Sequence, residues 1–355
     1  MKLNKEKYFM FYLKNPNWFV IVFLAFATNI FAQSPPKKET CKNVVKQNNN
    51  SYLFVYFTGN NKDEEQIRFA LSENGYNFKA LNQNQPVIKS EEISVTGGVR
   101  DPHILRSENG KIFYMVATDM TSEKGWDSNR GIVLMKSNDL LHWTSKAIQI
   151  NKLFPKEFGN IVRVWAPQTI FDPVKKRYMI YFSMLKKGDN EYDKIYFSYV
   201  NKDFTTLESL PKQLFYSPDK KACIDADIVY HNGKYHLFFK TEGHGNGIKK
   251  AISDKLTSNW KLQDKYLQQT TNAVEGSGVF RLNNSKDWIL MYDMYMNNSY
   301  QFTRSTDLEK FDVIDKEISM DFSPRHGTIL PITNKEAERL IKKWQSVEET
   351  SIVEK

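Results

Sequence analysis

The stretch Ile132–Trp143, IVLMKSNDLLHW, shows the pattern that decides the fold of this chain. An apolar run with strand character is followed by Ser, Asn and Asp, which favour a turn, and then by a second apolar segment. The pattern occurs five times at intervals of roughly 50 to 65 residues, which is typical of propeller blades. The other copies are Ile67–Phe78 (IRFALSENGYNF), Ile195–Phe204 (IYFSYVNKDF), Ile248–Trp260 (IKKAISDKLTSNW) and Tyr300–Phe311 (YQFTRSTDLEKF).

Each of the last four copies follows two further strand patterns that are joined by a turn. Asn and Gly in most of these turns supply the positive φ that tight hairpins need. The paired strands are expected over His103–Val116, Thr169–Phe182, Asp227–Phe239 and Val279–Tyr292. Each repeat is therefore predicted to be an outer strand of a blade whose inner strands come first.

The first and last units of the chain are incomplete, and each supplies what the other lacks. Tyr52–Phe57 has no preceding partner strand, and Arg325–Ile332 has no strand after it. We therefore expect an all-β fold, a five-bladed β-propeller closed by a C-terminal strand that pairs with N-terminal strands. Such closure leaves no sheet edge open around the ring.

Both ends of the chain are expected to lie outside this propeller. Four lysines precede an uncharged apolar run, Trp18–Ala27, and a small residue at Ala32, which predicts a signal peptide over residues 1–32 and an exported, periplasmic or extracellular protein. The run is short for a membrane span, so none is expected after cleavage, an uncleaved anchor being the alternative. Residues 33–50 are predicted to be a disordered leader, residues 51–345 the propeller domain, and residues 346–355 a tail.

A single convincing helix is expected at the end of the propeller domain. Thr333 and Glu336 have the spacing of a capping box. Four apolar residues after them share one helical face, namely Ala337, Leu340, Ile341 and Trp344. The helix should pack on the outside of the propeller.

Charge and cysteine content argue against two other classes of protein. The net charge is +9, and the predicted signal peptide, with four Lys and one Glu, accounts for part of it. Lysine pairs such as Lys186-Lys187, Lys220-Lys221 and Lys249-Lys250 are dispersed, so we interpret them as solvated surface and expect no nucleic-acid partner. Cys41 and Cys223 cannot form a disulfide framework; two unpaired thiols are favoured over one bridge.

Three carboxylates share a setting at the start of innermost strand patterns. Asp101 lies in GGVRDPHI (97–104), Asp225 in ACIDADIV (222–229) and Glu275 in VEGSGVF (274–280). Because the first strand of every blade lines the central channel, we expect the three acids to share one funnel. The alternatives are a turn acid before a proline for Asp101, a role for Asp227 in place of Asp225, and a solvent-facing strand residue for Glu275.

Five short motifs, one in each blade, resemble those of glycoside hydrolase family 43, the five-bladed arabinanases, arabinofuranosidases and xylosidases. The resemblance extends from Tyr52 to Thr333. In chain order the motifs are Arg100-Asp101-Pro102, Trp165-Ala166-Pro167, Ile224-Asp225-Ala226, Glu275-Gly276 and Arg325-His326-Gly327. Any one of these motifs is common, but their order and their distribution over five blades are specific.

The resemblance implies an inverting glycosidase with assigned roles for the three acids. Asp101 would be the general base, Glu275 the general acid, and Asp225 the residue that orients Glu275 and raises its pKa. No cofactor would be required, although family members often hold an ion near the histidine that corresponds to His326. A Ca²⁺ in the central channel is one interpretation of that residue, and a histidine satisfied by hydrogen bonds is the other.

Sugar binding would depend on aromatic residues and on loops around the funnel. Trp165 and Trp126 are candidates for stacking on a sugar ring, Trp165 being favoured, against the alternative that they cap blades. Loops over residues 119–129 and 240–247 would set the sugar specificity. Gln168 departs from the Glu that many members carry after Trp-Ala-Pro, which puts a substrate subsite in doubt.

We therefore expect an exported enzyme that cleaves furanosyl or pentosyl linkages of plant-type oligo- or polysaccharides. An α-L-arabinofuranosidase is the best single expectation, with β-xylosidase or β-galactofuranosidase as alternatives. A propeller that binds glycans without catalysis is the alternative from a different class. The three acids favour the enzyme, because a binding module has no need for carboxylates at three blade entrances.

Overall fold

The computed structural model describes residues 49–188, 192–242 and 246–345, all of which fall in one compact unit. The expected signal peptide, most of the leader, Cys41 and the tail lie outside the described residues. Strand β1 (Asn49–Tyr56) begins two residues inside the expected leader, because Asn49 already pairs with Thr333. Within the described part of the chain, no helix is both long and apolar enough to cross a membrane.

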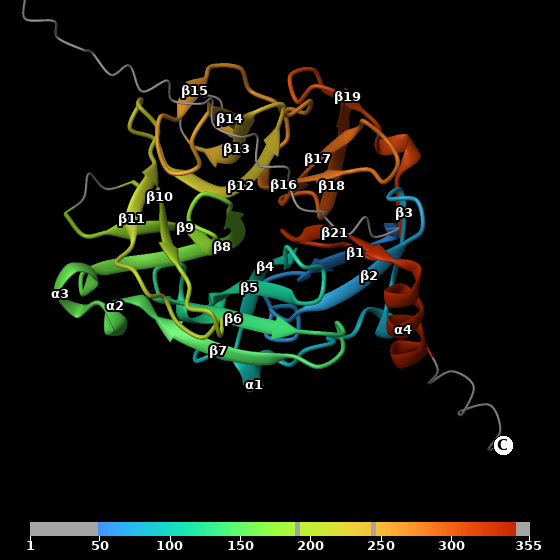
Figure 1. The fold of residues 1–355 in the computed structure, drawn as a ribbon, viewed down its shortest axis with the longest axis horizontal. Coiled ribbons are helices and arrows are strands. Elements are labelled where there is room, and N and C mark those ends of the chain that lie inside the picture. The colour runs from blue at the N-terminus through green and yellow to red at the C-terminus, as the bar shows by residue number, and fades with distance from the viewer. Residues whose placement is uncertain (1–48, 189–191, 243–245, 346–355) are drawn as a thin grey trace, which may run out of the picture. The chain divides into compact units, whose positions relative to one another are not determined.

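The five-bladed β-propeller expected from the repeats is confirmed (Figure 1). In the described ranges, four sheets have four strands each, ordered outward from the centre of the ring. Their strands are β4 (Val99–Arg106), β5 (Phe113–Asp119), β6 (Gly131–Ser137) and β7 (Thr144–Gln149); β8 (Ile161–Asp172), β9 (Arg177–Lys186), β10 (Lys194–Tyr199) and β11 (Lys212–Phe215); β12 (Cys223–His231), β13 (Lys234–Thr241), β14 (Gly247–Ser253) and β15 (Lys261–Gln263); β16 (Glu275–Arg281), β17 (Trp288–Met294), β18 (Ser299–Ser305) and β19 (Asp312–Val313).

The remaining sheet combines both ends of the described chain. Its order is β21-β1-β2-β3-β20, with β21 (Thr328–Thr333) innermost. The other strands in it are β2 (Arg68–Ser72), β3 (Asn77–Ala80) and β20 (Ser319–Met320). Strand β21 pairs antiparallel with β1, for example Leu53 with Leu330, and β20 adds a short parallel pair to β3 that was not predicted. The innermost strands β21, β4, β8, β12 and β16 contact one another in a ring.

Apolar side chains fill the space between neighbouring sheets. Among the described residues there are five apolar clusters, and each joins two adjacent blades. Between the first and last blades, for example, Tyr56 stacks on Phe322 with ring centroids 4.5 Å apart. Aromatic pairs of this kind add about 0.5–1.5 kcal/mol to the free energy gained by area burial. The core is thus divided among the blade interfaces.

The repeated Ser-x-Asp/Asn motif has a structural cause at the end of the third strand of a blade. In the second blade the Ser137 hydroxyl accepts hydrogen bonds from the amides of Asp139 and Leu140. The Asp139 carboxylate accepts the next two amides, those of Leu141 and His142, at 2.9 Å each. Ser305 and Asp307 repeat this arrangement in the last blade. These side chains replace the backbone partners that a chain leaving a sheet would otherwise lack.

One lysine pair differs from expectation. Lys249 and Lys250, predicted on solvated surface, are buried on β14. The Nζ of Lys250 reaches Glu309 of the next blade at 2.7 Å, so it neutralises a charge at the blade interface. Lysine at a buried strand position is tolerated because its ammonium is paired.

The C-terminal helix α4 (Asn334–Trp344) has the predicted capping box. Ala337 and Leu340 are buried against β1 and β21, but Ile341 is 40% exposed. Ile341 lies at the edge of the apolar face, because Leu340 occupies the centre and successive residues turn by about 100°. The Arg106 guanidinium binds both Glu336 oxygens at 2.7 Å, which fixes the helix to the second blade. Shorter helices are η1 (Asn82–Asn84), α1 (Ser90–Ile93), η2 (Ser122–Lys124), α2 (Ile150–Leu153), α3 (Pro155–Phe158) and η3 (Asp315–Glu317).

A chain that ends at Asp321 should lose the ordered propeller. It lacks β21 and α4, so the inner edge of β1, with its buried run from Tyr52 to Tyr56, is left unpaired. Unpaired apolar edges promote aggregation. Size-exclusion chromatography and thermal melting of the truncated and full chains test this, and a monomer with a cooperative melt would show that closure is not required.

Candidate active site

Four innermost strands carry a β-bulge at the same place, and these bulges shape the site. Register shifts follow Arg100 in β4, Trp165 in β8, Ile224 in β12 and Glu275 in β16. The next residue in each strand has positive φ: Asp101 (50°), Ala166 (46°), Asp225 (54°) and Gly276 (61°). Bulges redirect side chains and are frequent next to active sites. Asp101 and Asp225 therefore lie within strands and not at strand starts as predicted, whereas Glu275 is the first residue of β16.

A cavity of about 370 Å³ lies over the innermost strands, and all five sheets or the loops between them contribute to it. All six residues that the sequence suggested line this cavity: Asp101, Trp126, Trp165, Asp225, Glu275 and His326. The other lining residues are Asn60, Arg100, Met120, Ile224, Lys240, Glu242, Tyr295, Met296 and Arg325. The loops expected over residues 119–129 and 240–247 thus contribute Met120, Trp126, Lys240 and Glu242.

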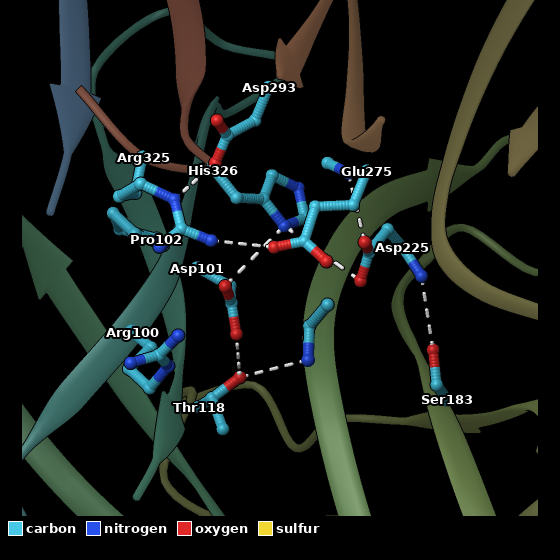
Figure 2. A network of polar contacts seen from close by, with 12 residues as sticks. Arg100, Asp101, Pro102, Thr118, Ser183, Asp225, Glu275, Asp293, Arg325 and His326 are labelled. Carbon is cyan, nitrogen blue, oxygen red and sulfur yellow. Dashed lines mark hydrogen bonds and ion pairs between the residues drawn. The ribbon is translucent and has the colours of Figure 1, made fainter. Parts of the chain in front are cut away.

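His326 lies between two of the acids (Figure 2). Its Nδ1 is 3.5 Å from an Asp101 carboxylate oxygen and 3.9 Å from one of Asp225. Burial alone lowers the pKa of an imidazole, but the hydrogen bond to Asp101 and the charges of both aspartates raise the pKa of His326 to about 9. His326 is therefore an imidazolium at neutral pH.

Asp101 is held in its ionised form. Thr118 of β5 donates a hydrogen bond to it at 2.8 Å, and Thr118 in turn accepts one from the Ala166 amide at 2.8 Å. Burial favours the neutral acid, but His326, followed by Arg100 and Thr118, lowers the pKa of Asp101 below its usual value. A buried carboxylate with a lowered pKa can accept a proton at neutral pH.

The pKa of Asp225 is shifted in the opposite direction to that of Asp101. Burial raises its pKa to about 6, against the charge of His326 and together with the charges of Glu275 and Asp101. Its Oδ2 accepts a hydrogen bond of 2.9 Å from the Gly276 amide, and its backbone carbonyl accepts one of 3.1 Å from Ser277. Asp225 thus contacts the residue directly after Glu275 through the backbone.

The glycine after Glu275 is required by this packing. A Cβ on Gly276 would lie 2.7 Å from Cγ of His326, and its φ of 61° disfavours other residues. Gly276 therefore lets the imidazolium lie directly against the Gly276 backbone.

Two cations contact the Glu275 carboxylate. Arg325 donates to its Oε1 at 2.7 Å, and Lys240 of β13 donates to its Oε2 at 3.3 Å. Arg325 is itself bound by the buried Asp293 at 2.5 Å, and burial raises the pKa of Asp293 to about 7 despite that arginine. Lys240 also lies 3.3 Å from Glu242. Each oxygen of Glu275 therefore has its own positively charged partner.

Arg100 and Arg325 were not predicted as site residues, whereas Lys240 is the first residue of a range predicted to set the sugar specificity. Arg100 and Arg325 occupy the motif position that Glu275 and Trp165 occupy in other blades, so an alignment of the five motifs contains a signal for both. Each guanidinium lies over the ring of Phe57, at 4.5 and 5.8 Å from its centroid. Lys240 reaches the cavity from a second strand, where the motifs give no signal.

The two tryptophans form one corner of the cavity. Trp126 is 51% exposed, and its ring meets Trp165 edge to face with centroids 6.4 Å apart. The indole N–H of Trp165 is buried and has no hydrogen-bond partner among the described residues. The exposed indole surface of Trp126 suits the apolar face of a sugar ring.

Two residues that adjoin site residues in the sequence do not line the cavity. Asp227 does not line the cavity, because its Oδ2 accepts the Val279 amide at 2.6 Å between neighbouring strands. Gln168 is buried and accepts the Tyr181 hydroxyl at 2.9 Å, outside the cavity lining. The departure at Gln168 therefore does not alter the cavity wall.

Direct binding of the possible Ca²⁺ by Nδ1 of His326 does not fit the surroundings of this residue. The Nδ1 of this imidazolium is directed at two carboxylates, and a protonated nitrogen has no lone pair for a metal. No group of three or more acidic, histidine or cysteine side chains within the described ranges is arranged to hold an ion. His326 thus has two carboxylate partners, and an ion held near it through water stays a prediction. Cys223 is buried and forms no disulfide with another described residue, while Cys41 lies outside the described part of the chain.

His326 should make the stability of the fold depend on pH. Its pKa is raised from 6.5 to about 9, so its stabilising charge is fully present below pH 6.5 and is lost as the pH rises through 9. The full shift corresponds to a loss of up to about 3 kcal/mol. Urea unfolding of the parent chain should show this fall, and His326→Gln should remove it.

His103 offers a matched control for that experiment. It is also buried near the channel, but burial and the charge of His326 lower its pKa to about 3, so it stays neutral over the same interval. His103→Gln should leave the pH slope as in the parent. An equal slope in all three proteins would contradict a charged His326.

Comparisons with known proteins agree with this geometry. A family model described as a probable glycosyl hydrolase domain, related to family 43, matches residues 47–338. An α-L-arabinofuranosidase of Bifidobacterium longum is 25% identical over 229 residues, which are 58% of this chain and 20% of that protein. The chain therefore spans about a fifth of the length of this curated relative.

Two solved structures share the fold. A family 43 β-1,3-galactosidase gives a TM-score of 0.54 at 15% identity, over 74% of this chain and 56% of its own. The family 43 protein BlXynB from Bacillus licheniformis gives 0.51 at 14% identity, over 80% of this chain and 56% of its own. With a family model matched over most of its length and a propeller whose cavity is lined by the three expected acids, the chain belongs to glycoside hydrolase family 43.

Proposed function

We propose that this glycoside hydrolase is an exported, inverting enzyme that removes α-L-arabinofuranosyl groups from plant-type polysaccharides. The observation that carries the proposal is a cavity in which one carboxylate, Asp101, is held ionised opposite a second, Glu275, whose oxygens have separate partners. The partial similarity to an arabinofuranosidase supports the choice of sugar. The apolar run before Ala32 supports export.

In the proposed mechanism Asp101 is the general base. A water molecule between Asp101 and the anomeric carbon would give up a proton to the carboxylate as it attacks. Thr118 and His326 hold the carboxylate in place from two sides, at 2.8 and 3.5 Å. The fixed imidazolium also favours negative charge on Asp101 before the reaction begins.

Glu275 is the proposed general acid. Arg325 occupies its Oε1, so Oε2 is the oxygen that would carry a proton to the leaving group, once Lys240 at 3.3 Å gives way. Asp225 would orient this residue through the Gly276 amide and through its negative charge. After proton transfer, Arg325 and Lys240 would stabilise the Glu275 carboxylate.

Substitution of the two acids should separate their roles. Glu275→Gln should lower turnover of arabino-oligosaccharides by about 10²–10⁴-fold and that of nitrophenyl arabinofuranoside much less, because an activated leaving group needs little protonation. Asp101→Asn should abolish both. Rates are compared with Asp227→Asn, a neighbouring acid outside the cavity. Near-normal rates for Asp101→Asn on either substrate would contradict its role.

The stereochemistry of the first product tests the proposed inversion. Proton NMR during early hydrolysis should show the anomer opposite to that of the substrate, since an inverting pair places water between the base and the sugar. A panel of arabinosides, xylosides and galactofuranosides identifies the sugar in the same series. Retention of configuration would require a nucleophile in place of a base, and no hydrolysis in the whole panel would favour a glycan-binding propeller.

A further inference from the structure

Arg163 joins both tryptophans of the cavity corner to the scaffold. Its Nε and one terminal nitrogen bind Asp193 at 3.0 and 2.6 Å, and the other terminal nitrogen binds Asp127 at 2.8 Å. The guanidinium lies 4.2 Å from the ring centroid of Trp165. One planar cation thus contacts the face of one indole and the residue next to the other, Trp126.

The two carboxylate partners of Arg163 differ in how firmly the scaffold holds them. Asp193 is buried, and its backbone carbonyl accepts the Cys223 amide at 2.9 Å, so it belongs to the scaffold. The Asp127 side chain is 61% exposed and lies on the loop that carries Trp126. Asn129, at the end of that loop, also binds the Val164 backbone beside Arg163. Strand β8 therefore holds the loop at two points.

We propose that Arg163 is a positioning residue for glycan binding, which sets the Trp126–Trp165 corner as a preformed sugar-stacking subsite. The inference rests on the proposed function for the class of ligand, a pentose oligosaccharide. Three N–H donors of the guanidinium bind two carboxylates, while its central carbon lies over the Trp165 ring. The Trp126 ring stays exposed, so the corner keeps an indole surface for the sugar.

A rigid corner of this kind lowers the cost of binding, because the rings need not be ordered when the sugar arrives. Lysine cannot replace arginine here, since a single ammonium cannot bridge Asp127 and Asp193 and also stack on an indole. The role should therefore show in the affinity for a sugar chain more than in the chemical step.

The test measures binding of arabinotriose and of xylotriose by calorimetry, using the full chain with Asp101→Asn so that no hydrolysis occurs. In this Asp101→Asn chain, a second substitution Arg163→Lys should weaken binding about tenfold. Asp127→Asn in its place should weaken binding less, because it removes only one of the two carboxylate partners of Arg163. In the otherwise native enzyme, Arg163→Lys should raise KM for the oligosaccharide more than it lowers kcat. Acrylamide quenching of tryptophan fluorescence should increase in both variants without any ligand.

Arg177→Lys is the matched control. Arg177 also pairs with a carboxylate, Glu208, and lies over an aromatic ring, Tyr199 at 5.0 Å, but it does not line the cavity. Binding by the Arg163→Lys chain equal to that of its parent, or equal losses in the Arg163 and Arg177 variants, would overturn the inference. If the parent binds neither trisaccharide, the proposed substrate class fails, and the quenching difference alone then decides whether Arg163 positions the corner.

Discussion

The contact between one imidazolium and two aspartates connects the fold of this protein to its chemistry. His326 lies just before β21, while Asp101 and Asp225 come from β4 and β12. Two carboxylates beside each other would repel in a buried site, and the positive charge between them removes that cost. The acids can therefore share one cavity only when the final strand has entered the first sheet.

Ion pairs also neutralise the charged side chains that surround His326 and the two aspartates. Arg100 pairs with the buried Glu65 at 2.9 Å, Arg325 with Asp293, and Lys240 with Glu242, so each cation of the cavity has an anionic partner. The paired charges largely cancel, so the cavity does not favour a charged ligand over an uncharged sugar. Recognition is left to aromatic faces and hydrogen bonds, as in most sites for uncharged ligands.

The repeats and motifs predicted the propeller and most of the cavity because both follow from short-range patterns. Alternating apolar residues recur in every blade, Ser-x-Asp/Asn turns follow the third strand in three of the five blades, and four of the five motifs are placed at equivalent bulges. The pattern could not show the β-bulges themselves. Each bulge reverses the side of the sheet to which every later side chain in that strand points. For that reason Gln168 and Asp227, which are close to site residues in the sequence, are turned away from the cavity. Lys240 enters the cavity from a strand that carries no motif. The burial of Lys250 was missed for a different reason, since its partner Glu309 is distant in sequence.

The pairing of β1 with β21 also has a consequence for how the protein folds. The hydrogen bond between Ser51 and Asn334 joins residues 283 positions apart, so the first blade can be completed only after nearly all of the described chain is present. Contacts of such high sequence separation slow folding, because the entropy of a very long loop must be lost before they form. The four blades between are built from strands that are neighbours in sequence, so their pairing needs no such long loop. Catalytic competence should thus arise in a single late step, so no shorter nascent fragment could hydrolyse a glycan.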